Sequence, residues 1–157
     1  RIRRDAFTDC LARKGLDAAL IEQGNHQVGG GHDAMVRLLH AHPRPTAVLA
    51  SNDMTAIGAL GAIHESGLRV PGDISIVGFD DIQISAFTMP ALTTVRLSRD
   101  EIARVAFRAL YSIRQDGGKG AEYSVRPSLV VRQSTGRVLA QPARRARPSA
   151  PHPKRTY

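Results

Sequence analysis

The chain has 157 residues, 42% of them apolar and 23% charged, which are the proportions of a soluble globular protein with one core. No apolar run approaches the length of a membrane-spanning helix, so a membrane partner is not expected. The single cysteine, Cys10, excludes an internal disulfide bond and fits a reducing compartment such as the cytoplasm.

The net charge of +8 is concentrated at the C-terminal end. Residues 137–157 contain six basic residues and no acidic ones, and the rest of the chain carries a net charge of only +2. We therefore divide the chain into a core, residues 1–135, and a basic, proline-rich tail, residues 136–157, which is expected to be disordered. A solvated tail is the preferred interpretation, and nonspecific contact with phosphates is the alternative.

The chain begins in a pattern typical of an amphipathic helix. This helix is expected over residues 2–14, with Gly15 as its C-terminal stop and one apolar face containing Phe7, Cys10 and Leu11. Cys10 is expected to be a buried core residue. The arginines of the first turn oppose the helix dipole, which favours a ligand-facing role for one of them. A solvated arginine or a surface ion pair is the alternative.

A short strand at residues 18–21 and a second helix near residues 31–41 come next. The glycines at 29–31 are expected to form a flexible loop, with Asp33 capping the helix. No Lys-Ser or Lys-Thr pair follows them, so a P-loop is excluded. His40 and His42 do not face each other on a helix, and no metal site or cofactor is predicted.

The central stretch, residues 45–97, alternates apolar runs with helical and turn patterns. Strands are expected at 46–50 and 74–77, with a helix over 54–66 between them. Uninterrupted apolar runs indicate strands covered on both faces, so we predict an α/β fold with a three-layer parallel sheet. Ligands of such sheets bind beyond the carboxyl ends of the strands. Asn52 and Asp80 occupy that place in two successive units and should face one cleft.

Each of these two residues has an acidic neighbour that competes for the same role. Asn52 and Asp53 can both cap the helix that starts at Met54, so one of the two is left free for another role. Asp80 and Asp81 should point to opposite sides of an extended segment, so they are not expected to share a proton or a metal ion. Asp80 is expected to face the cleft and Asp81 to be structural. Phe79 packs either beside the ligand or in the core.

The helix over 54–66 is apolar nearly all round, so it must be covered on two sides. One side is its own sheet, and the other is assigned to a second subunit, with upstream elements as the alternative. The expected dimer contacts come from this helix and from the segment 84–89. They are Met54, Ile57, Gly58, Gly61, Phe87 and Thr88.

The chain returns to the sheet twice more. A strand is expected at 93–96, followed by a helix over 98–115 that begins with a capping box of Ser98 and Glu101. A last strand is expected at 128–132. The helix over 98–115 has a continuous apolar stripe that needs a partner surface.

Four blocks of this sequence resemble the effector-sensing core of the LacI/GalR family of bacterial transcription regulators. They are PTAVLASND, then A-x-G-A-L-x-A, then GLRVPGDISIVGFDD, then PALTTVRL, in that order within residues 1–135. The resemblance implies a type I periplasmic-binding-protein-like fold that is incomplete here. Because the chain starts without Met inside a helical pattern, we expect a helix-turn-helix, a hinge helix and a first subdomain upstream.

The resemblance also implies a set of effector contacts. Arg3, Asn52 and Asp80 match family positions that bind the effector. The resemblance therefore assigns the ligand contact to Asn52 and leaves the helix cap to Asp53. His26 lies near a stacking aromatic of relatives, although an exposed loop histidine is the preferred interpretation. Leu97 departs from the polar residue that relatives often place there, which leaves the effector's identity open between a sugar and a purine-like molecule.

The leading functional hypothesis is the effector-binding, dimerising core of a LacI-type regulator, usually a repressor, acting on operator DNA through the missing N-terminal domain. A periplasmic sugar-binding transport protein is the first alternative. An α/β enzyme is the second, but the sequence contains no G-x-S-x-G elbow, no HExxH and no Cys–His signature, so no catalytic residues are assigned.

Overall fold

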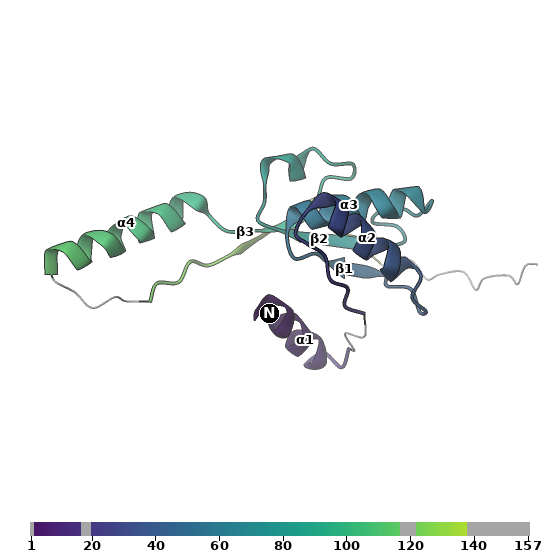
Figure 1. Cartoon of the computed structure of the whole chain (residues 1–157), viewed down its shortest axis with the longest axis horizontal. Helices are drawn as coiled ribbons and strands as arrows, with labels where there is room; N and C mark the ends of the chain where they lie inside the picture. The colour runs from purple at the N-terminus through teal and green to yellow at the C-terminus, as the bar shows by residue number, and fades with distance from the viewer. Residues whose placement is uncertain (1, 17–19, 117–121, 138–157) are drawn as a thin grey trace, which may run out of the picture.

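The computed structural model describes residues 2–16, 20–116 and 122–137. The elements in chain order are α1 (Ile2–Ala12), α2 (Val28–Leu39), β1 (Ala47–Leu49), α3 (Asp53–Glu65), β2 (Ser75–Phe79), the short 3-10 helix η1 (Gln83–Ala86), β3 (Thr93–Arg96), α4 (Arg99–Asp116) and β4 (Ser128–Val130). The sheet order is β1-β2-β3-β4, with parallel pairing from β1 to β3 and antiparallel pairing of β4 with β3 (Figure 1). The predicted α/β class and parallel core are confirmed, and β4 makes the sheet mixed.

The core lies between the sheet and two stacked helices. α3 is the crossover between the parallel strands β1 and β2, and α2 packs against α3 (Figure 1). Strand residue Ile76 and helix residues Met35, Ala56 and Ile63 are almost completely buried in one apolar cluster. Burial of such side chains supplies the main driving force for this layered arrangement.

Close contact between α2 and α3 depends on two glycines. A Cβ atom on Gly31 would lie 2.3 Å from the carbonyl oxygen of Thr55, and one on Gly58 would lie 1.9 Å from that of Val28. The prediction of a flexible loop at 29–31 is therefore wrong, because these glycines lie inside α2. Its N-cap residue is Gln27, and Asp33 is within the helix.

The same contact changes the interpretation of α3. Its second side is covered by α2 of the same chain, and the small size of Gly58 serves this packing. Gly58 is consequently buried and not available to a second subunit, which corrects its assignment to a dimer contact. Met54, Ile57 and Gly61 are only partly buried.

Two further predictions about the first part of the chain fail. Cys10 is exposed, because α1 makes few contacts with the body and only Phe7 and Leu11 of its predicted apolar face are half-buried. The predicted strand at 18–21 is absent in its described half, since Leu20 and Ile21 are exposed and irregular. Its other two residues, 18 and 19, lie outside the described residues, as does most of the predicted tail, residues 138–157.

The other predicted elements are confirmed, with ends that shift by a few residues. β3 and β4 run away from the body to α4, which lies at the far end of this strand pair (Figure 1). We call β3, β4 and α4 the arm. The Ser98 Oγ accepts the N–H of Glu101 at 3.3 Å, as expected for the cap of α4. No helix in the described ranges is long and apolar enough to cross a membrane.

Residues 133–136 anchor the base of the arm to the centre of the sheet. Ile76 of β2 donates its N–H to the Ser134 carbonyl (2.8 Å) and accepts the Ser134 hydroxyl (2.6 Å). The same hydroxyl accepts the N–H of Thr93, and Ser134 is completely buried.

Candidate functional site

Polar side chains gather where β1 and β2 end at the same edge of the sheet. Ser51 and Asn52 follow β1, Phe79 and Asp80 end β2, and Arg3 and His26 reach this edge from α1 and from the segment before α2. We call these six residues the strand-end cluster. The meeting of carboxyl ends is a direct consequence of parallel pairing, with Leu49 opposite Val77.

Contacts within the strand-end cluster hold its members together. An Nη1 hydrogen of Arg3 is donated to the Ser51 carbonyl at 2.7 Å, and the Arg3 guanidinium carbon lies 4.4 Å from the centroid of the Phe79 ring. Phe79 is half-buried beneath it, so it belongs to this edge and not to the apolar core. A guanidinium over an aromatic face is stabilised by the ring quadrupole.

His26 contributes to the cluster through both its side chain and its backbone. Its ring Nδ1 lies 3.1 Å from the Ser51 hydroxyl, and its carbonyl accepts the Asn52 side-chain amide at 3.0 Å. His26 has a φ angle of +63°, in the left-handed region that is uncommon outside glycine. The loop that contains His26 therefore packs against the strand-end cluster through Ser51 and Asn52.

The helix cap is Asn52, which corrects the assignment of that role to Asp53. The Asn52 Oδ1 accepts the N–H of Thr55 at 2.9 Å, in the usual geometry of an N-cap. Asp53 instead points into the body, because β2 has a glycine beside it: a Cβ on Gly78 would lie 2.1 Å from the Asp53 Oδ1. A glycine inside a strand is the sequence signal for such a close approach.

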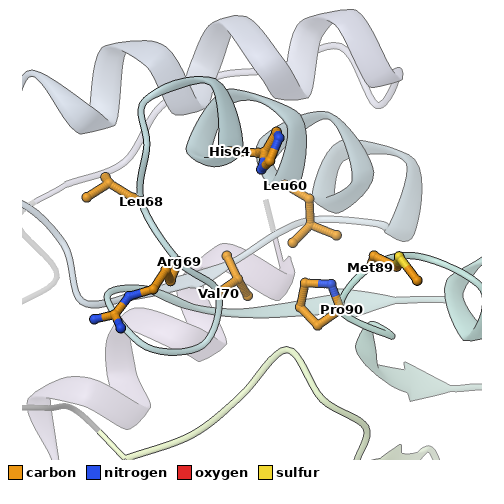
Figure 2. A pocket seen from close by; sticks show the side chains of 7 residues that line it. All are labelled: Leu60, His64, Leu68, Arg69, Val70, Met89 and Pro90. Carbon is orange, nitrogen blue, oxygen red and sulfur yellow. The ribbon is translucent and has the colours of Figure 1, made fainter.

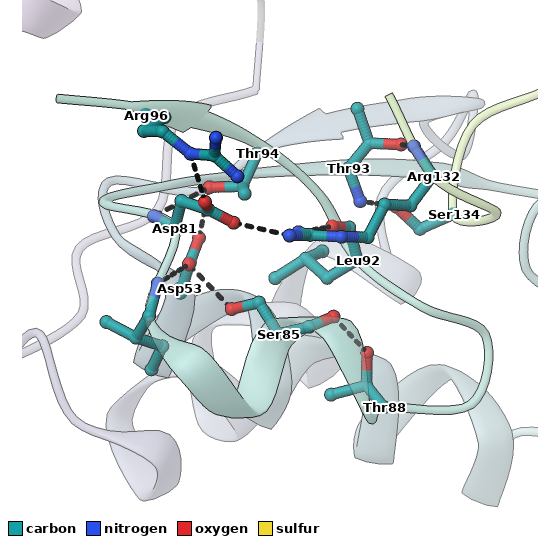
Figure 3. Close-up of polar contacts among 11 residues, drawn as sticks. Asp53, Asp81, Ser85, Thr88, Leu92, Thr93, Thr94, Arg96, Arg132 and Ser134 are labelled. Carbon is teal, nitrogen blue, oxygen red and sulfur yellow. Dashed lines mark hydrogen bonds and ion pairs between the residues drawn. The ribbon is translucent and has the colours of Figure 1, made fainter. Parts of the chain in front are cut away.

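Asp53 is completely buried and is bound by three donors. It accepts the N–H of Ile82 at 2.9 Å and the hydroxyls of Ser85 at 2.6 Å and Thr94 at 2.5 Å (Figure 3). Because buried carboxylates need such partners, Asp53 joins α3, η1 and β3 into one unit. The sequence patterns did not predict this structural role.

Asp80 is half-buried at the edge of the strand-end cluster and has a φ angle of +109°. Burial raises the pKa of its carboxyl group above the ordinary value, and the charge of Asp53 acts in the same direction. The positive charges of Arg3, Arg99 and His26 act against this rise but do not cancel it. The carboxylate is thus placed beside cationic groups in a partly desolvated position.

Asp81 faces away from the strand-end cluster and forms two ion pairs. Its carboxylate oxygens lie 2.5 Å from the Arg96 Nε and 2.6 Å from an Arg132 Nη2, and its side chain is only 8% exposed (Figure 3). Burial alone would raise the pKa of this carboxyl, but the hydrogen bonds from Arg132 and Arg96 outweigh it and hold the pKa below its usual value. The two arginines pair with Asp81 and not with the adjacent Asp80.

A shallow hollow of about 210 Å³ lies on another part of the surface (Figure 2). It is lined by the end of α3, the segment leading to β2 and the segment after η1, through Leu60, His64, Leu68, Arg69, Val70, Met89 and Pro90. None of these residues belongs to the strand-end cluster. No group of three or more His, Cys, Asp or Glu side chains in the described parts of the chain is arranged to hold a metal ion.

The segment around η1 presents apolar side chains to solvent. Phe87 is 77% exposed and Met89 is 96% exposed. Thr88 is half-buried, and its hydroxyl is donated to the Pro90 carbonyl at 2.8 Å, which fixes the turn that carries its two neighbours. Large apolar side chains exposed side by side are typical of an interaction surface.

The chain resembles known proteins over most of its length. The family model for the periplasmic binding protein-like domain matches residues 1–135. The HTH-type transcriptional repressor PurR of Mannheimia succiniciproducens is 38% identical over 117 residues, which are 74% of this chain and 35% of that protein. The ribose operon repressor of Escherichia coli is 37% identical over 113 residues, 70% of this chain and 34% of that protein.

A solved structure gives the same result for the fold. The lac repressor dimer bound to operator and the anti-inducer ONPF is 32% identical, with a TM-score of 0.79 over 86% of this chain and 47% of that one. The fold and the strand-end cluster thus define a periplasmic-binding-protein-like domain. The chain belongs to this domain family, and the proteins that it is similar to include transcriptional repressors of the LacI type. It spans about a third of the length of the PurR and ribose operon repressors.

Proposed function

We propose that this chain is the ligand-sensing and dimerising core of a LacI-type transcriptional regulator. Its proposed effector is a small polar molecule, a sugar or a purine-like compound, bound at the strand-end cluster. The observation that carries the proposal is the meeting of Arg3, Asn52 and Asp80 at one sheet edge. Arg3 donates a hydrogen bond to the Ser51 carbonyl, and the Asn52 amide donates one to the His26 carbonyl. Three repressors among its relatives support the regulatory role over transport or catalysis.

The chemistry of the cluster suits a ligand with hydroxyl or ring N–H groups. Asp80 makes no side-chain hydrogen bond that the structure describes, so its carboxylate oxygens can accept two donors from the ligand. Arg3 supplies further donors, and the face of Phe79 beneath it gives apolar contact. Hydrogen bonds to a charged group contribute about 1.5–3 kcal/mol each, which is enough to fix the orientation of a small ligand.

The regulatory step follows from linkage between two states of the protein. An effector changes affinity for operator DNA only if it binds the two states with different affinities. We propose that closure of a second subdomain over the strand-end cluster supplies this difference, and that DNA is bound by a helix-turn-helix domain outside this sequence.

The dimer contact is proposed at Phe87 and its neighbour Thr88, together with the partly buried Met54, Ile57 and Gly61 of α3. The exposure of Phe87 supports this placement. The solved lac repressor is a dimer, which supports dimerisation of this chain.

Ligand titration of the purified chain tests the effector site. The probes are D-ribose, lactose and hypoxanthine, and binding is measured by isothermal titration calorimetry. We expect Asp80→Asn to weaken binding of the active probe by about 10-fold or more, because the charged acceptor is lost. Asp73→Asn is the matched control, since Asp73 pairs with Arg69 on another part of the body and makes no contact with the cluster. Equal affinities of the wild type and Asp80→Asn would contradict the assignment.

A further inference from the structure

The turn after β2 is bound at three consecutive backbone amides. The Asp80 N–H is donated to the Val95 carbonyl at 2.9 Å, the Asp81 N–H to the Thr94 hydroxyl at 3.4 Å, and the Ile82 N–H to Asp53 at 2.9 Å. The φ angles of Asp80 and Asp81 are +109° and +51°, a region that is unfavourable for residues other than glycine. The turn keeps this conformation because β3 and α3 fix it from outside.

From this turn, the Asp81 carboxylate binds one arginine on β3 and one in the segment that follows β4. Arg96 is the last residue of β3 and is opposite Ser128, the first residue of β4. Arg132 lies two residues beyond β4 and also donates to the Leu92 carbonyl at 2.7 Å. One nearly buried side chain therefore joins the end of β3 to the segment that follows β4 (Figure 3).

We propose that Asp81 is a positioning residue that makes the direction of the arm depend on the backbone turn that presents Asp80. The inference rests on the proposed function for the role of Asp80 as effector contact. Asp81, the residue after this contact, is proposed to link Asp80 mechanically to β3 and β4. A change in the turn moves the Asp81 carboxylate, and the two arginines move with it because their charges have no other carboxylate partner among the described residues.

The Asp81 ion pairs differ from a single surface pair in the two chain segments that they connect. A single surface pair contributes little to stability, and one arginine would satisfy one carboxylate. Here the carboxylate is buried, bidentate toward two strands, and adjacent to a residue held in the same unfavourable region of backbone conformation. Elements with two discrete arrangements are how coupling between sites is carried.

The test measures the arm's direction without any ligand. Spin labels are attached to Ala47→Cys on β1 and Ser128→Cys on β4, both exposed positions, in a chain with the exposed Cys10 replaced by serine. Pulsed electron–electron double resonance then gives the distribution of distances between the two spin labels. We expect one narrow distribution for the otherwise unchanged chain and a distribution at least twice as wide for Asp81→Asn, because the arginines lose their common partner.

Asp73→Asn is the matched control, since it removes a carboxylate from another arginine pair of the body and should leave the width unchanged. If Asp81→Asn does not fold, as judged by circular dichroism, Arg132→Gln takes its place, because it releases only β4. A distribution as narrow as that of the unchanged chain, in whichever of the two variants is folded, overturns the proposal.

A second pair of variants tests whether the turn moves the arm. Asp80→Val is expected to shift the mean distance, because a β-branched residue strongly disfavours positive φ angles, whereas Asp80→Asn tolerates them and should not. In the Asp81→Asn background, Asp80→Val should add no shift. An unchanged mean in Asp80→Val, or the same shift with and without Asp81, overturns the link. Failure of every ligand probe would count against the proposed function alone, since these distances are measured on the free chain.

Discussion

At the scale of single residues, two pairs of neighbours divide their roles in a way that local patterns only partly predict. The separation of Asp80 from Asp81 was anticipated, although both have positive φ angles instead of the expected extended backbone. The cap was assigned to the wrong member of the pair Asn52 and Asp53, because both residue types are equally good caps. Gly78, on a different strand, decides between them by leaving room for the Asp53 carboxylate.

The raised pKa of Asp80 predicts that effector binding weakens in acid. The carboxylate form accepts hydrogen bonds from the ligand, and protonation removes one acceptor and its charge. Because burial places the pKa above the ordinary value of 3.8, affinity should begin to fall at a higher pH than for an exposed aspartate. Calorimetric titrations between pH 7.5 and pH 4.5 measure this.

Asp80→Asn is the control for that measurement, since an amide does not titrate in this range. Its affinity should vary less with pH than that of the wild type. The same pH dependence in the wild type and in Asp80→Asn would exclude Asp80 as a charged acceptor for the ligand.

At the scale of elements, apolar runs predicted most strands and helices, whereas the packing of α2 on α3 was not predictable from either helix alone. Three successive glycines normally indicate a loop. Gly31 is tolerated inside α2 because the backbone of α3 occupies the space of its missing side chain. That fact depends on the pairing of two helices, so it could not be read from the local sequence.

The two glycines of α3 should therefore respond oppositely to the same substitution. Gly58→Ala is expected to lower the free energy of unfolding by about 1–3 kcal/mol, since its Cβ would collide with the backbone of α2. Gly61→Ala has only the flexible His32 ring at 3.9 Å and should be neutral or raise stability by up to about 1 kcal/mol through better helix propensity.

Urea denaturation followed by circular dichroism compares the two variants on the same chain. Because both substitutions add one methyl group to the same helix, the difference between them isolates the α2–α3 contact. Equal effects of the two substitutions would mean that the helices do not approach this closely.

At the scale of the whole molecule, the body of the fold and the proposed site follow from parallel strands whose carboxyl ends meet, as predicted. The arm is the part that local sequence patterns describe less well. The apolar stripe of α4 was predicted, but within the described residues it remains exposed, with Leu110 70% and Ile113 45% accessible to solvent. Phe107, which was not part of the predicted stripe, is 67% accessible. Such a surface favours association with another apolar surface.

We expect the isolated chain to self-associate through α4. The double substitution Phe107→Gln and Leu110→Gln keeps good helix propensity while removing the apolar side chains. It should lower the average size of the associated species in sedimentation velocity, because the contact through α4 is lost. Ala103→Gln on the same helix is the control and should leave the distribution unchanged. If the double variant associates as strongly as the wild type, the contact lies elsewhere, with Phe87 as the next surface to alter.

The attachment of residues 133–136 to β2 sets a practical limit on how this chain can be shortened or fused. A reporter domain joined after residue 137 leaves the hydrogen bonds of Ser134 to Ile76 and Thr93 in place. A cut made directly after β4 would instead remove both hydrogen bonds between Ile76 of β2 and Ser134, one to its carbonyl and one from its hydroxyl. Shortened versions of the chain, whether for variant libraries or for crystallisation, should accordingly keep Ser134 as part of the sheet.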